Sequence, residues 1–101
     1  MVIRVVELTK EGTTFEPGMR FKLKEVFLNV NNIVKFAELS LQEVRTMWPG
    51  WDFPQPIDDE TRFTKIYHSL GGRAPSVLVV MGPADLIEHK INTGSRQLLQ
   101  G

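Results

Sequence analysis

The sequence predicts an α+β domain that is mainly β: a small antiparallel sheet or partly open barrel of about four to six strands with one C-terminal helix. Three observations support this fold class. Residues 19–24 alternate strictly between apolar and basic side chains, which is typical of a half-buried strand. Residues 2–8 and 77–81 are runs rich in β-branched side chains. A Gly-Pro pair at 82–83 precedes apolar residues at helical spacing.

The first third of the chain predicts two strands joined by turns. Residues 2–8 form the first strand, and turn signals follow at 10–14 and 17–18, with Phe15 between them able to pin the loop to the core. In the alternating segment the apolar residues are expected to face the core, namely Met19, Phe21 and Leu23. After Lys24 the apolar positions shift by one residue, which predicts a bulge or bend at this point.

Three asparagines interrupt an apolar run at residues 24–37, which is expected to form two strands around which the other segments pair. Asparagine tolerates left-handed backbone and hydrogen-bonds nearby amides, so Asn29, Asn31 and Asn32 predict a tight corner. The next strand is expected to begin at Ile33.

A short helix is predicted from about 41 to 48. Ser40 and Glu43 match a capping box, and Leu41 and Val44 lie at helical spacing before Pro49-Gly50. The alternative is a strand that continues from Ile33, because Leu39 and Leu41 also alternate.

A long insertion follows this helix. Residues 48–56 are aromatic and proline-punctuated, and residues 58–60 are acidic. Loops of this length between paired strands are often functional.

The last third predicts a hairpin and a helix. Strands at 63–70 and 77–81 are joined by a turn at 71–75, and the second strand is apolar on both faces and therefore central. The helix is expected from Pro83 to about residue 91, with Lys90 near its negative C-terminal end and Gly94 as a cap. Residues 1–94 then form one domain and 95–101 a tail.

This order of elements resembles the FlbD-like family of small flagellar and swarming-motility proteins, and uncharacterised small phage proteins of similar plan. The residues that carry the resemblance are 26–29 with 33–34, then 64–66, then 78–80 running into 84–87. The resemblance implies a small sheet or barrel with a C-terminal helix and no enzyme activity. The longer N-terminal loop and the insertion at about 38–62 depart from the family pattern.

Composition restricts the functional classes. Apolar residues make up 42% and charged residues 24% of the 101 residues, as in ordinary globular domains. The formal net charge of zero argues against non-specific nucleic-acid binding and permits oligomers. The lack of cysteine excludes disulfides and zinc–thiolate sites. No run reaches the length of a membrane span and Arg4 follows Met1 too closely for a signal peptide, so a cytoplasmic protein is expected.

The sequence contains no pattern typical of catalysis. His68 and His89 lie in different predicted elements without metal-ligand neighbours, and there is no nucleophile elbow, P-loop or dinucleotide fingerprint. Asp58, Asp59 and Glu60 are consecutive and lack the spacing of a cation loop. We expect no enzyme, no cofactor and no bound metal.

Two groups of side chains are the candidate binding residues. The loop aromatics could stack on a ligand or fill a partner's pocket, or they could fold back over an open end of the sheet. The basic stripe could meet phosphates, with Lys35 and Lys65 as possible neighbours, or it could be a solvated face paired with Glu7 and Glu25. The candidates are Trp48, Trp51, Phe53, Arg20, Lys22, Lys24 and Arg73.

Three functions are compatible with these features. The first is a non-enzymatic, self-associating binding module whose loop at 48–60 engages a protein partner. The second is an oligomer that sequesters a nucleotide-like anion between subunits, as some phage counter-defence proteins do; here aromatic rings would stack the base and cations would hold the phosphate. The third and weakest is a nucleic-acid binder.

Overall fold

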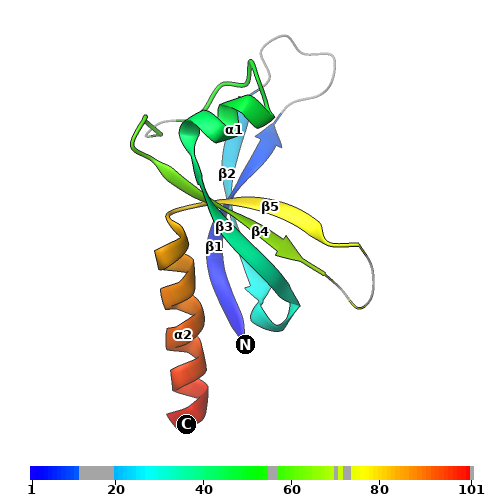
Figure 1. The fold of residues 1–101 in the computed structure, drawn as a ribbon, viewed down its shortest axis with the longest axis vertical. Helices are drawn as coiled ribbons and strands as arrows, with labels where there is room; N and C mark the ends of the chain where they lie inside the picture. The colour runs from blue at the N-terminus through cyan, green and yellow to red at the C-terminus, as the bar shows by residue number, and fades with distance from the viewer. Residues whose placement is uncertain (12–19, 55–56, 70, 72–73, 101) are drawn as a thin grey trace.

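A computed structural model describes residues 1–11, 20–54, 57–69, 71 and 74–100 (Figure 1). Five antiparallel strands form one open sheet in the order β2-β1-β5-β4-β3, which confirms the mainly β class. In chain order the elements are β1 (Val2–Glu11), β2 (Arg20–Asn29), the 3-10 turn η1 (Val30–Asn32), β3 (Ile33–Ser40), α1 (Leu41–Met47), β4 (Arg62–His68), β5 (Ser76–Met81) and α2 (Ala84–Gln100). In the described ranges, no helix is both long enough and apolar enough to cross a bilayer.

The sheet curves, so that strands which are not hydrogen-bonded to one another share a core. Ile33 and Phe36 of the edge strand β3 pack against the same buried cluster as Ile3 and Val5 of β1. Helix α2 closes this cluster with Ile87, which is fully buried. We call the sheet face that bears Ile3 and Val5 the inner face.

A second buried cluster lies on the opposite face, which we call the outer face. Leu8 of β1 and Phe21 of β2 belong to it, together with Leu41 and Val44 of α1. Successive side chains of a strand point to opposite faces, so Val5 and Leu8 cannot contact the same core. Helix α1 and the loop that follows it cover one end of the outer face, and α2 lies toward the other end of the sheet (Figure 1).

The predicted bulge at Lys24 and Glu25 is wrong. The β1–β2 ladder runs without a register shift from Val2 opposite Asn29 to Glu11 opposite Arg20. The shift in the apolar pattern arises because the buried side of the hairpin changes, from the outer face at Phe21 to the inner face further along β2. A register irregularity occurs instead at the start of β3, between Ile33 and Lys35.

The asparagine corner is confirmed as η1. The side chain of Asn29 accepts a hydrogen bond from the backbone N–H of Asn31 at 3.0 Å. Two backbone hydrogen bonds hold the corner against neighbouring segments. The Val30 N–H donates to the Met1 carbonyl, and the Ser69 N–H donates to the Asn32 carbonyl.

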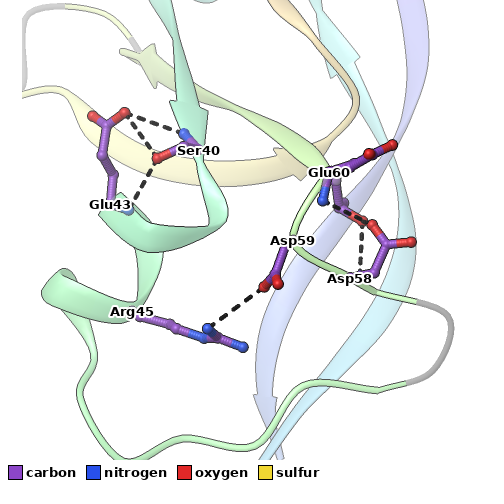
Figure 2. A network of polar contacts seen from close by, with 7 residues as sticks. Ser40, Glu43, Arg45, Asp58, Asp59 and Glu60 are labelled. Atoms are coloured by element: carbon purple, nitrogen blue, oxygen red, sulfur yellow. Dashed lines mark hydrogen bonds and ion pairs between the residues drawn. The ribbon is translucent and has the colours of Figure 1, made fainter.

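Helix α1 is confirmed, and the alternative of a continuing strand is wrong. Ser40 Oγ accepts from the Glu43 N–H, while Glu43 Oε1 accepts from the Ser40 N–H, both at 3.2 Å (Figure 2). These reciprocal bonds satisfy two N–H groups at the helix start. Leu41 and Val44 then point into the outer-face cluster.

The predicted hairpin and the central position of its second strand are both confirmed. β4 pairs with β5 from Phe63 opposite Met81 to His68 opposite Ser76, and β5 lies between β1 and β4. The turn predicted at 10–14 is wrong at its start, because Lys10 and Glu11 continue β1 and pair with β2. The described residues do not include 12–14, the turn at 17–18, Phe15, Met19 or part of the turn at 71–75.

Helix α2 begins at Ala84, one residue after the expected start at Pro83, and extends further than predicted. It continues through Gly94 to Gln100, so Gly94 is not a cap and residues 95–100, predicted as a tail, are helical. A glycine costs only about 1 kcal/mol relative to alanine within a helix, so it does not by itself end one. Lys90 therefore lies inside the helix rather than at its C-terminal end. Its Nζ donates a hydrogen bond to the Arg4 carbonyl at 3.0 Å, which ties α2 to β1.

Candidate binding site

The aromatic loop folds back over the outer-face cluster, which is the second of the two alternatives predicted for the loop aromatics. Phe21 is buried at its centre and stacks on Trp51 with ring centroids 4.8 Å apart. Trp48 meets Phe21 edge-on at 5.6 Å, and Phe53 lies 5.0 Å away. The three loop aromatics remain half-buried, so each contributes to the core and keeps part of its surface accessible.

Cations border the aromatic cluster. The Nζ atom of Lys10 lies over both indoles, 5.6 Å from the Trp48 ring and 5.3 Å from the Trp51 ring. The guanidinium of Arg45 lies 6.0 Å from the Phe53 ring. Such cation–π contacts hold the rings in place at a partly exposed site.

The acidic residues of the loop make polar contacts within the loop and with α1. Asp59 forms an ion pair with Arg45 at 3.8 Å (Figure 2). Asp58 Oδ1 accepts from the Glu60 N–H at 2.9 Å and from the Thr61 hydroxyl at 3.3 Å. Among the residues that the structure describes, no group of three or more His, Asp or Glu side chains has the arrangement of a metal site.

The loop also pairs with the outer edge of the sheet. The N–H of Phe21 donates to the Asp52 carbonyl at 2.8 Å, and Arg20 and Asp52 form a single parallel bridge. The loop then leaves the strand. A hollow of about 390 Å³ opens beside this bridge, and we call it the β2-edge hollow. Its lining residues are Arg20, Phe21, Lys22, Leu23, Asp52, Phe53 and Pro54.

The structure brings three of the seven predicted site residues into this hollow: Arg20, Lys22 and Phe53. Lys24 is exposed further along the same side of β2, opposite Glu7 of β1. Trp48 and Trp51 support the loop without lining the hollow. Arg73 lies outside the described residues.

The other predicted neighbours of the basic stripe do not join it. Lys35 and Lys65 belong to β3 and β4, on the far side of the sheet from β2. Their Nζ atoms lie 4.6 and 5.0 Å from the Tyr67 ring. A hydrogen bond with Lys65 lowers the pKa of the Tyr67 hydroxyl, and the positive charges of Lys65 and Lys35 act in the same direction. Glu25, a predicted partner of the stripe, pairs with Arg4 instead.

Sequence reasoning missed two features of the hollow. Leu23 is expected in the core, but it is 36% exposed, on the end strand of the sheet opposite the buried Leu8. The backbone of Asp52 was not expected to pair with β2. The alternation of Trp51, Asp52 and Phe53 is the one local signal of such pairing, because two aromatics flanking a charge fit an extended segment on a sheet edge.

Comparisons with known proteins returned no match to any family model, any curated protein or any solved structure. The resemblance to FlbD-like proteins therefore stays a prediction.

The stacking of Trp51 on Phe21 predicts that this indole stabilises the fold. We expect Trp51→Ala to lower the free energy of unfolding by about 2 kcal/mol, below the value for a fully buried tryptophan because the ring is half-buried. Trp51→Phe should recover most of the loss. Urea unfolding followed by circular dichroism measures both.

Val34→Ala serves as the control, because Val34 is 60% exposed on β3 and its truncation should change stability by no more than about 0.5 kcal/mol. An unfolding midpoint for Trp51→Ala equal to that of wild type would show that the loop does not form part of the core.

Proposed function

We propose that this protein is a non-enzymatic binding module that takes an extended segment of a protein partner along the outer edge of β2, beside the aromatic loop. The observation that carries the proposal is the Phe21–Asp52 hydrogen bond next to the β2-edge hollow. The chain's own Asp52 already pairs with this edge of β2, opposite Arg20. The hollow lies next to this pair and is lined by Leu23 and Pro54, so a partner segment could continue the pairing there.

Strand geometry supports addition at this edge. β2 is an end strand of the sheet, and its neighbour within the sheet is β1. Successive N–H groups of a strand point to opposite sides, so the N–H groups of Leu23 and Glu25 face outward as that of Phe21 does. An extended peptide that bonds to such an edge gains affinity from its backbone and specificity from alternate side chains.

The side chains on this edge favour a particular partner. Lys22 and Lys24 project from one face, and Leu23 projects from the other toward the hollow. A segment with acidic residues on one side and apolar residues on the other would match both faces. Lysines on an edge strand also disfavour edge-to-edge pairing with a second copy.

A labelled peptide of alternating glutamate and valine tests the proposal by fluorescence anisotropy at low salt. We expect the double variant Lys22→Glu/Lys24→Glu to weaken binding about tenfold, since two attractive cross-strand pairs become repulsive. The matched control is Lys35→Glu/Lys65→Glu, which makes the same charge change near the opposite edge and should leave affinity unchanged.

Amide hydrogen exchange of the complex provides the second readout. The N–H groups of Leu23 and Glu25 should become protected when the peptide binds. Equal binding of a peptide with lysine in place of glutamate, or an equal loss in the control variant, would contradict the proposed partner chemistry. No binding by any alternating peptide would contradict addition at this edge.

A second candidate function is the sequestration of a nucleotide-like anion. The observation that favours it is that Arg20 and Lys22 line the same hollow as the Phe53 ring, so a base could stack while the cations hold a phosphate. The volume of about 390 Å³ lies within the range of small-molecule sites.

Thermal shift with mono- and cyclic nucleotides tests this candidate. A true ligand at 100 times its dissociation constant should add about 2.7 kcal/mol to the free energy of unfolding. Lys22→Gln should reduce the shift and Lys35→Gln should not. The absence of any shift across the panel would exclude this function.

A further inference from the structure

The end of the β1–β2 hairpin away from α1 exposes apolar side chains on its outer face. Phe27 is 65% exposed, Val2 is 60% exposed and Val6 is 36% exposed. The ladder places Phe27 opposite Arg4 and Val6 opposite Glu25, so these four side chains share one face and are neighbours. We call Arg4, Val6, Glu25 and Phe27 the checkerboard patch.

The exposure follows from the position of the core. At this end of the hairpin Ile3 and Val5 are buried on the inner face, against Ile87 of α2. The outer-face cover of α1 and the aromatic loop lies at the other end. Phe27 therefore leaves about two thirds of a large apolar ring in water, and covering this ring would be favourable. Exposed apolar patches of this kind often mark interaction sites.

The charges of the patch are arranged in a self-complementary pattern. Its apolar members, Phe27 and Val6, occupy one diagonal. Its charged members, Arg4 and Glu25, occupy the other diagonal, with Arg4 Nε and Glu25 Oε2 3.9 Å apart. Both charged side chains are more than half exposed, so this internal ion pair contributes little to stability and leaves both groups able to pair again.

We infer that this patch is an isologous interface between two copies of the chain. A twofold axis along the Phe27–Val6 diagonal places Phe27 on Phe27 of the second copy and Val6 on its counterpart. The same rotation places each Arg4 on Glu25 of the other copy. The two sheets then cross at a steep angle, as in orthogonally packed sheets.

The charges select this axis over the alternative. A twofold axis along the other diagonal would set Phe27 against Val6 of the second copy, but it would also set Arg4 on Arg4 and Glu25 on Glu25. Like charges in contact across an interface oppose association. The net charge of zero removes long-range repulsion between the copies. The proposed contact uses the outer-face side chains of β1 and β2 rather than the outward N–H groups of β2, and it does not depend on the proposed function.

Sedimentation equilibrium of the full chain over a range of concentrations tests the interface. The weight-average mass is expected to rise toward that of a dimer in the micromolar range, because the patch is small compared with tight interfaces. Phe27→Ser should keep the protein monomeric with an unchanged circular dichroism spectrum. Val34→Ser is the matched control, since Val34 is a similarly exposed apolar residue on β3, and it should dimerise as wild type does.

Charge exchange tests the axis. Arg4→Glu and Glu25→Arg should each reduce dimerisation at least tenfold, and the double exchange Arg4→Glu/Glu25→Arg should restore it. A monomeric wild type at millimolar concentration would overturn the interface, as would a dimer that persists in Phe27→Ser. Single charge reversals that leave dimerisation unchanged or strengthen it, or a double exchange that fails to restore it, would overturn the proposed axis.

Discussion

The core of this protein changes sides of the sheet partway along one continuous hairpin. Val5 is buried on the inner face and Leu8 on the outer face, while the β1–β2 ladder between them keeps its register. Because side chains of a strand alternate, one core cannot hold both residues. The two ends of the sheet therefore require separate covers, and these are α2 at one end and α1 with the aromatic loop at the other.

Both proposed surfaces are consequences of this change. Where the hairpin buries its outer face at Phe21, the inner-face lysines Lys22 and Lys24 remain in solvent. Where it buries its inner face at Val5, the outer-face ring of Phe27 remains in solvent. A sheet with a single core would have one solvated side, whereas this sheet has a basic surface and an apolar surface on opposite sides.

Local signals in the sequence predict most of the elements. The capping box at Ser40, the Asn29 corner and the Pro83 helix start each depend on neighbouring residues, and each is found in the structure. The bulge predicted after Lys24 is absent because the alternation argument assumes a single core for the whole strand.

The candidate site is only partly predictable for the same reason. Basic and aromatic residues identify Arg20, Lys22 and Phe53, but their meeting depends on the bridge between Arg20 and Asp52, which are distant in sequence. The most direct test of the account is a methyl NOE map of the folded protein. It should connect Val5 methyls with the Ile66 and Ile87 group, and Leu8 methyls with the Leu41 and Val44 group. Contacts from both Val5 and Leu8 to Ile87 would contradict a core that changes sides.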